Sequence, residues 1–147
     1  MARRLRPEEL EQLGVVSALA ALASDFSAHT GAQVRRRIAP GLPTLTAETQ
    51  LVIYRVAQEA LTNAARHSEG DTVELSLSRD NDAVVLRVAD NGRGLNGAAP
   101  GAGLRGMRER ALLVDGQLTV RDAPAGGTEV RLIVPLARNM ATQDGSP

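Results

Sequence analysis

The sequence predicts an α+β protein, a two-layer α/β sandwich in which a mixed, mostly antiparallel sheet packs on helices. Two observations support this fold class. Apolar residues recur at helical spacing in the first half of the chain, and after residue 71 their period changes to two, as in half-buried strands. Helices and strands are also grouped along the chain and do not alternate strictly, which favours this architecture over a doubly wound parallel sheet.

The composition fits one small domain. The chain has 147 residues, of which 43% are hydrophobic and 23% are charged, so a packed core is expected. No apolar run reaches the roughly 20 residues of a membrane span, and the N-terminus has no signal-peptide pattern. We therefore expect a cytoplasmic domain without membrane contact, in a protein that could be membrane-anchored as a whole. The absence of cysteine excludes disulfides and thiolate metal sites.

Charge and aromatic content exclude several classes of function. The formal net charge is zero and aromatic residues make up 1% of the chain, so nucleic acid is not an expected partner. All 17 basic residues are arginine. A P-loop and a eukaryotic-type protein kinase both need a lysine at the nucleotide phosphates, so the sequence excludes both.

The first half of the chain predicts two helices around a short strand. Pro7 and the acids after it are typical of a first helical turn, and the apolar pattern that follows ends at a C-cap at Gly31. Residues 34–38 are expected to be extended, before prolines break the chain. The second helix is expected to begin after an N-cap at Thr46 and to end near His67.

The second half predicts a sheet with one further helix. The strands are expected at residues 73–77, 84–88, 117–121 and 128–136. The first two form a hairpin with one buried face, because apolar and polar residues alternate on both sides of a turn at residues 80–82. A loop at residues 91–103 leads to a helix at residues 104–114. The tail from residue 137 is expected to fray.

Two glycine patterns fit the dinucleotide motif G-x-G-x-x-G. GRGLNG, which begins at Gly92, follows a strand, but the proline and glycine after it would break the helix that the motif requires. GAGLRG, at residues 101–106, is preceded by loop and not by a strand. A Rossmann dinucleotide site is therefore not expected.

Asp90 is the first candidate binding residue. It has the same parity as the buried residues of its strand, so its carboxylate faces the core where the strand ends. A buried acid needs a hydrogen-bond donor, and the exocyclic amine of adenine would serve. Gly92 and Gly94 would let the backbone approach a flat ligand. The alternative is that this stretch is only a turn.

The second candidate is a polar stripe on the second helix. Glu59, Asn63, Arg66 and His67 lie within about a third of its circumference, beside an apolar arc. An amide oxygen suits Mg²⁺, and the two basic side chains can donate to phosphate oxygens. The alternative is a solvated polar face. Thr128 adds a third point, because its hydroxyl is expected to face inward at the start of a strand after two glycines.

Four segments together resemble the ATP-binding catalytic domain of bacterial sensor histidine kinases, whose superfamily includes type II topoisomerases, ninety-kilodalton heat-shock chaperones and mismatch-repair ATPases. Residues 58–67 resemble the N box, residues 90–94 the G1 box, residues 101–107 the G2 box, and residues 126–128 the closing glycine-threonine motif. The resemblance implies the Bergerat ATP-binding fold. QEALTNA-x-x-H and GLRGMRER resemble the nitrate-sensor and DesK-like subtype, as does the stretch at residues 5–14, which resembles the end of its dimerisation region.

The resemblance implies a role for each candidate. Asp90 would bind the adenine amine, directly and through water with Thr128. Asn63 would ligate Mg²⁺, and Glu59 would assist the metal or act on the attacking group; these two would be the catalytic residues. The implied ATP-binding residues are Asn63, Arg66, His67, Asp90, Gly92, Gly94, Gly101, Gly103, Leu104, Gly106 and Thr128. The three glycines of the G2 box would form a mobile lid, with the helix start at Leu104 facing the phosphates.

The resemblance also implies partners. The phosphoacceptor histidine is expected outside this chain, because His67 lies in the N box and His29 lacks the usual acidic neighbour. The chain would then be a fragment in which residues 1–30 end the dimerisation region, residues 31–137 form the catalytic domain and residues 138–147 form a flexible tail. A response regulator would act downstream. Two alternatives stay open: a serine kinase of the anti-sigma-factor type, and an interaction module of the same fold without nucleotide.

Overall fold

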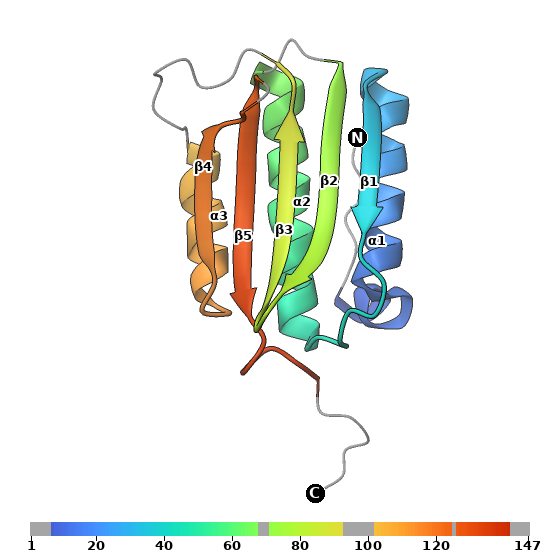
Figure 1. Ribbon diagram of the computed structural model, residues 1–147. Helices are drawn as coiled ribbons and strands as arrows, with labels where there is room; N and C mark the ends of the chain where they lie inside the picture. The colour runs from blue at the N-terminus through green and yellow to red at the C-terminus, as the bar shows by residue number, and fades with distance from the viewer. Residues whose placement is uncertain (1–6, 68–70, 93–101, 125, 142–147) are drawn as a thin grey trace, which may run out of the picture.

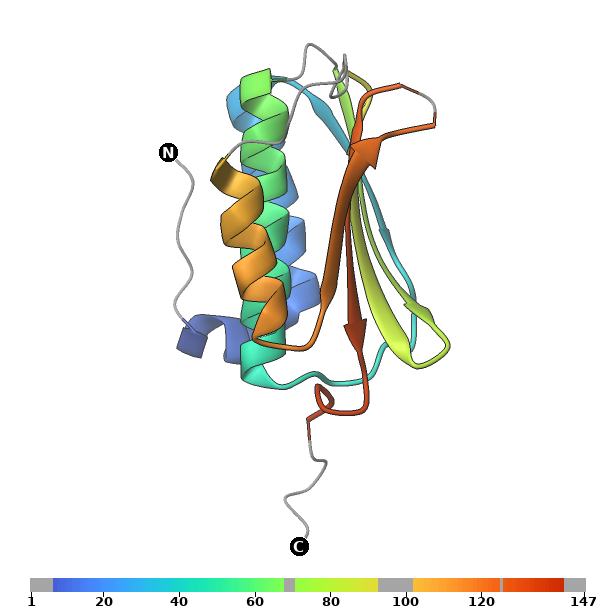
Figure 2. The same cartoon turned by 90° about the vertical axis from the view of Figure 1, so that its left-hand side faces the viewer.

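The computed structural model describes residues 7–67, 71–92, 102–124 and 126–141, and it has two layers. One face of a five-stranded sheet carries the three helices of the described chain, and the other face carries none of them (Figures 1 and 2). The helices are α1 (Pro7–Thr30), α2 (Ala47–His67) and α3 (Ala102–Leu112). The strands are β1 (Gln33–Ile38), β2 (Thr72–Asp80), β3 (Ala83–Asp90), β4 (Gln117–Asp122) and β5 (Thr128–Pro135).

The sheet is mixed and mostly antiparallel, as the sequence predicts. Its strand order is β1-β2-β3-β5-β4. Only the pairing of β1 with β2 is parallel; β3 pairs antiparallel with β2 and with β5, and β4 pairs antiparallel with β5. Val88 lies opposite Leu75 on one side and opposite Val130 on the other. This register places the apolar residues of the three central strands on the face that the helices cover.

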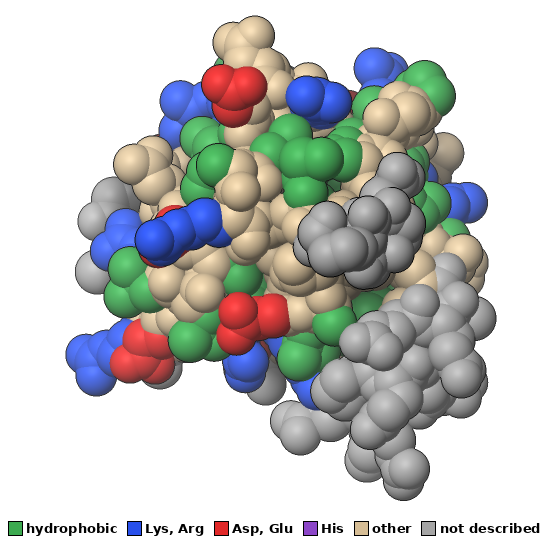
Figure 3. Space-filling view, turned by 90° about the horizontal axis from the view of Figure 1, so that it is seen from below, with side chains coloured by type: hydrophobic (Ala, Val, Ile, Leu, Met, Phe, Trp, Pro, Cys, Tyr) green, Lys and Arg blue, Asp and Glu red, His purple; other side chains and the backbone are tan. Residues whose placement is uncertain are grey.

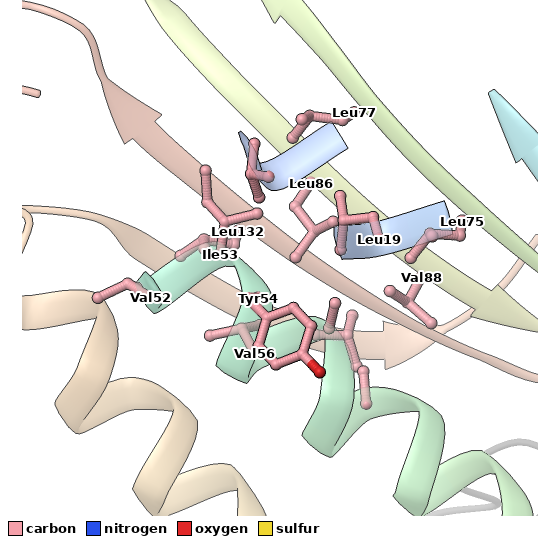
Figure 4. Packing of buried hydrophobic residues seen from close by; sticks show 14 of the residues in the cluster. Leu19, Val52, Ile53, Tyr54, Val56, Leu75, Leu77, Leu86, Val88 and Leu132 are labelled. Atoms are coloured by element: carbon pink, nitrogen blue, oxygen red, sulfur yellow. The ribbon is translucent and has the colours of Figure 1, made fainter. Parts of the chain in front are cut away.

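The core lies between the sheet and the helices. All three helices contribute to it, and α2 contributes along most of its length. Figure 4 shows Leu19, Ile53 and Leu86 gathered between the layers, and each of them is at most 1% exposed. Because α1 shares this core, the predicted domain boundary at residue 30 does not separate two cores in the described chain. The boundary itself stays a prediction.

The helix ends follow the capping signals in the sequence. The hydroxyl of Thr46 accepts a hydrogen bond from the backbone N–H of Thr49 at 3.2 Å, which confirms the N-cap of α2. Gly31 has a φ of +78° and its N–H donates to the carbonyl of Ser27 after the end of α1. The break at Gly14 was not predicted: with a φ of +81° it interrupts α1 after two turns.

The tail differs from the prediction that it frays from residue 137. Asn139 is buried, its side-chain nitrogen donates to the carbonyls of Val114 and Pro135, and its side-chain oxygen accepts from the hydroxyl of Thr49. The N–H of Ala141 donates to a carbonyl in the loop before α2. The chain is therefore docked as far as residue 141, because a buried amide needs these partners. Residues 142–147 lie outside the described part.

The lower end of the molecule in Figure 1 shows hydrophobic side chains interspersed with charged ones (Figure 3). The large hydrophobic side chains that stay exposed in the described chain are Val16, Leu112, Leu113 and Met140. In the described residues, no helix combines the length and the apolar character needed to cross a membrane.

Candidate functional site

Four of the secondary-structure ends at the upper end of the molecule carry the predicted site. α2 and β3 end there, and β5 and α3 begin there (Figures 1 and 2). Antiparallel pairing places the end of β3 beside the start of β5, because Ala89 near the end of β3 lies opposite Glu129 near the start of β5. Packing of α2 across the same strands brings the end of that helix to the same edge. The N box, the G1 box and the glycine-threonine motif therefore come together.

Asp90 is the last residue of β3 and is half-buried. It shares parity with Val88, which is 2% exposed beneath the helices, so the inward orientation predicted from the sequence is confirmed. One carboxylate oxygen of Asp90 accepts hydrogen bonds from two backbone N–H groups, that of Gly92 at 2.9 Å and that of Thr128 at 3.2 Å. These two bonds hold the carboxylate at the edge of the sheet.

Thr128 was predicted to approach the same ligand as Asp90 from a second strand, and in the structure the two residues contact each other directly. The backbone N–H of Thr128 donates to the Asp90 carboxylate, a contact that reasoning about the Thr128 hydroxyl did not predict. Strand pairing explains this result. β5 begins at Thr128 just where β3 ends, so the first N–H of β5 has no ladder partner on β3 and turns to the Asp90 carboxylate.

Gly127 leaves no room for a side chain beside Asp90. A Cβ built on Gly127 would lie 1.9 Å from the carbonyl oxygen of Asp90 and 2.7 Å from its Oδ1. Its φ of +91° also disfavours any residue with a Cβ. The neighbouring Gly126 has a similar φ of +98°, but a Cβ there would meet nothing within 4 Å. Only Gly127 is therefore required by the close approach of the two strands.

The polar stripe on α2 faces the start of α3. Val56, Ala60 and Ala64 are buried, which confirms the predicted apolar arc, and Glu59 and Asn63 beside them are half-buried. The rotation of α2 that buries the arc thus turns the carboxylate and the amide toward the first turn of α3.

Gly103, in the first turn of α3, lies close to Glu59 and Asn63 of α2. A Cβ on Gly103 would lie 2.7 Å from Oε2 of Glu59 and 3.3 Å from Nδ2 of Asn63. The first turn of α3 therefore packs directly on these two polar side chains. A carboxylate is favoured there, because the N-terminus of a helix carries a partial positive charge. The sequence placed these residues in one site but did not reveal this direct packing.

The G2 box differs from the predicted lid in one respect. α3 begins at Ala102 and not at Leu104, so Gly103 lies within the helix and not in the loop before it, whereas Gly106 lies in the helix, as the sequence predicts. Leu104 is partly buried and packs against the core. A Cβ on Gly106 would meet nothing within 4 Å. Because Gly103 has no side chain, the first turn of α3 can approach α2 closely.

Some predicted site residues lie outside the described part of the structure. These are Gly94 and Gly101, together with the side chains of Arg66 and His67. His29 lies in the last turn of α1, is exposed, and its Nδ1 lies 2.9 Å from the carbonyl oxygen of Asp25. It is a helix-end residue, as predicted.

Comparisons with known proteins agree with this arrangement. Residues 48–138 match the family described as histidine kinase-, DNA gyrase B-, and HSP90-like ATPases. The sensor histidine kinase MctS of Rhizobium johnstonii is 34% identical over 145 residues, which are 95% of this chain and 31% of MctS. The oxygen sensor histidine kinase NreB of Staphylococcus carnosus is 35% identical over 136 residues, which are 90% of this chain and 39% of NreB. The chain thus spans less than half the length of either relative.

Solved structures share the fold. The histidine kinase domain of a blue-light activated kinase from Erythrobacter litoralis superimposes with a TM-score of 0.71 at 23% identity, covering 88% of this chain and 69% of that one. The histidine kinase AdeS of Acinetobacter baumannii gives a TM-score of 0.67 at 15% identity, covering 84% and 64% of the two chains. The match to the family covers more than half of the sequence and includes all four ends that form the site, those of α2, β3, α3 and β5. The chain therefore belongs to the family of histidine kinase-, DNA gyrase B- and HSP90-like ATPases, and it contains the ATP-binding domain of that family.

Proposed function

We propose that this chain is the catalytic part of a two-component sensor histidine kinase, which binds Mg-ATP and transfers the γ-phosphoryl group to a histidine on a dimerisation domain outside the chain. The observation that carries the proposal is the meeting of two chemically different groups at one edge of the fold. Asp90 lies there at the end of β3, and the Glu59–Asn63 pair lies there against the start of α3. A nucleotide has a matching asymmetry, with a flat base at one end and charged phosphates at the other.

Asp90 is proposed to bind the base. Its carboxylate is held by the N–H groups of Gly92 and Thr128, so it accepts the amine of adenine without having to reorganise. The backbone approaches closely there because Gly127 has no side chain. A carboxylate that accepts from an exocyclic amine distinguishes adenine from guanine, whose corresponding position carries a carbonyl oxygen that would repel it.

Glu59 and Asn63 are proposed to hold the phosphate end with Mg²⁺. An amide oxygen and a carboxylate are hard ligands, and Mg²⁺ is usually bound by one or two such groups together with phosphates and water. Within the described residues no cluster of three or more histidine, cysteine or acidic side chains could hold a metal without help. Asn63 and Glu59 supply two such ligands, so they fit a metal that arrives with the nucleotide. When bound, Mg²⁺ would neutralise charge on the phosphates.

The remaining proposed contacts complete the phosphate end. The N-terminus of a helix favours an anion, and the first turn of α3 lies against Glu59 and Asn63. Arg66 and His67 are proposed to donate to phosphate or ribose oxygens. Gly94 and Gly101 are proposed to shape the base pocket and the lid. Transfer then needs little covalent chemistry from the protein: the imidazole nitrogen attacks the γ-phosphorus, the bond to the β-phosphate oxygen breaks, and ADP leaves.

The partners follow from this reaction. The acceptor histidine is proposed to lie on the dimerisation domain of the same protein, and the phosphoryl group would pass on to a response-regulator receiver domain. His29 is not proposed as the acceptor, because it lies at a helix end with its ring bonded to the carbonyl of Asp25. This chain alone is expected to bind nucleotide and to show little turnover.

Calorimetric titration with Mg-ATP tests the proposal. We expect wild type to bind, and we expect Asp90→Asn and Asn63→Ala each to bind at least about tenfold more weakly, since each loses a charge-assisted or metal contact. Asp80→Asn makes the same change as Asp90→Asn at the opposite end of the hairpin and should bind like wild type. If wild type does not bind ATP, the chain is a nucleotide-free interaction module. If it phosphorylates a serine on a protein antagonist, and the product survives acid, it is a serine kinase.

A further inference from the structure

Asn91 follows Asp90 directly, and it is tied to the start of β2 by four hydrogen bonds. Its backbone N–H donates to the carbonyl of Thr72 at 3.1 Å. Its side-chain oxygen accepts from the N–H groups of Asp71 and Thr72, each at 3.0 Å. Its side-chain nitrogen donates to Oδ1 of Asp71, also at 3.0 Å. The oxygen and the nitrogen of the Asn91 side-chain amide thus both form hydrogen bonds with residues 71–72. We call the four hydrogen bonds between Asn91 and residues 71–72 the Asn91 clasp.

The Asn91 clasp lies where the ladder between β2 and β3 ends. The last pair of that ladder is Val73 with Asp90. Beyond it the chain leaves the sheet through Gly92, whose N–H donates to the Asp90 carboxylate. Asn91 is the only residue between these two groups, so any rotation of its backbone moves the carboxylate and the donor relative to each other. A strand end normally frays, and four hydrogen bonds at one residue oppose that motion.

The opposite side of Asp90 is fixed by β5. Gly127 packs against the carbonyl of Asp90, and Thr128 donates to its carboxylate. Without the Asn91 clasp, the contacts with β2 would end at the pairing of Asp90 with Val73. The two sets of contacts flank the carboxylate from neighbouring strands, β2 and β5.

Asp71 is suited to its part in the Asn91 clasp. The hydrogen bond from Asn91 and a second one from the hydroxyl of Thr72 lower the pKa of the Asp71 carboxyl, so it is ionised at neutral pH and acts only as an acceptor. The backbone carbonyl of Asp71 also accepts from the N–H of Gln33 at the start of β1. The Asn91 clasp therefore joins three strand ends, those of β1, β2 and β3.

We propose that Asn91, held by Asp71, is a positioning residue that sets the adenine-binding carboxylate of Asp90 and thereby the preference for adenine over guanine. This inference rests on the proposed function, because it assumes that Asp90 binds the base. Asn91 itself contacts no nucleotide in the proposal and acts only through Asp90 and Gly92.

An exchange of the two side chains provides the test. Asn91→Asp alone places two carboxylates against each other at the position of a 3.0 Å hydrogen bond. Asp71→Asn alone keeps an oxygen that can accept from Asn91, so it should be mild. The double variant restores an amide facing a carboxylate with the direction of the bond reversed, and it leaves the net charge unchanged. Asn91→Ala removes the side-chain contacts altogether.

Affinity and selectivity are measured on the whole chain with Mg-ADP and Mg-GDP. We expect Asn91→Ala and Asn91→Asp each to weaken Mg-ADP binding about fivefold to tenfold, as for the loss of one or two hydrogen bonds, and to lower the preference for ADP over GDP. Asp71→Asn and the double variant should stay within about twofold of wild type. Gln117→Ala, which removes an exposed amide at the other end of the sheet, should change neither quantity.

Hydrogen exchange of the nucleotide-free chain separates this inference from the proposed function. Asn91→Ala should speed exchange of the Gly92 and Thr128 amides, which donate to Asp90, and the double variant should restore their protection. If wild type binds no adenine nucleotide, the proposed function fails and exchange still decides whether Asn91 positions Asp90. The inference is overturned if those amides exchange as in wild type, if the preference for ADP is unchanged in Asn91→Ala, or if the double variant behaves like Asn91→Asp.

Discussion

Replacing Gly127 with alanine tests the close approach of β5 to Asp90. The new Cβ would lie 1.9 Å from the carbonyl oxygen of Asp90, whereas ordinary contacts begin at 3.4 Å, so an atom must move by about 1.5 Å. The atom is a backbone oxygen and not the end of a flexible side chain, so either β3 or β5 has to shift. The hydrogen bond from Thr128 to the carboxylate is then lost.

Gly126→Ala is the matched control. Both glycines have a positive φ, +98° and +91°, so both variants carry backbone strain of about 1 to 3 kcal/mol. Only the Gly127 variant adds a steric overlap, since a Cβ on Gly126 meets nothing within 4 Å. Overpacking of this kind costs about 1 to 3 kcal/mol, and the lost hydrogen bond to a charged group about 1.5 to 3 kcal/mol. We therefore expect Gly127→Ala to be less stable than Gly126→Ala by about 3 to 5 kcal/mol.

Urea unfolding followed by circular dichroism measures this difference, and Mg-ADP titration measures its effect on binding. Gly127→Ala should unfold at much lower urea than Gly126→Ala and should bind ADP more weakly, because Asp90 is displaced. A Gly127→Ala chain that does not fold, beside a folded Gly126→Ala chain, agrees with the same reasoning. Equal unfolding midpoints and equal ADP affinities for the two variants would refute it.

Three further predictions follow from the contacts. Gly103→Ala should weaken Mg-ATP binding in a titration while changing the unfolding free energy little, since its Cβ displaces the end of a flexible carboxylate. Gly106→Ala should raise the unfolding free energy by up to about 1 kcal/mol through helix propensity, and with it the thermal midpoint. Glu129→Gln should destabilise by about 2 to 3 kcal/mol at pH 7, less than for a fully buried pair because one of its arginine partners is 58% exposed. The arginines hold the pKa of Glu129 below its ordinary value against the effect of burial. Urea unfolding at different pH values should therefore show this difference at neutral pH and its loss as the pH falls through the lowered pKa of Glu129. Asn139→Ala should destabilise by about 3 kcal/mol, since it leaves the hydroxyl of Thr49 and two carbonyls without their bonds, and a midpoint shift below about 2 °C would contradict this.

Local patterns in the sequence predicted much of the fold. The period of 3.6 located the buried arc of α2, and with it the stripe that carries Glu59 and Asn63, because burying one arc fixes the rotation of the helix. The period of two oriented Asp90 for the same reason. Capping at Thr46 depends on neighbouring residues alone, so it too could be read from the sequence.

Contacts between residues far apart in the chain could not be predicted in this way. The break at Gly14 is tolerated because the N–H of Val15 donates to the side chain of Gln50, which lies 35 residues later. The tail is docked because Asn139 finds partners on three other segments, although its own neighbours have the composition of a frayed end. Side-chain parity also missed the backbone N–H of Thr128, because parity describes where side chains point and not which backbone groups lack a ladder partner.

The central claim is that one nucleotide lies between Asp90, at its base, and Asn63, at its phosphates. Calorimetric titration with adenosine and with Mg-ADP tests it most directly, because adenosine has a base and no phosphate. The account predicts that Asp90→Asn weakens the binding of both ligands, whereas Asn63→Ala weakens that of Mg-ADP and leaves that of adenosine unchanged. If Asn63→Ala weakens adenosine as much as Mg-ADP, or if Asp90→Asn leaves adenosine binding intact, the two residues do not hold opposite ends of one nucleotide.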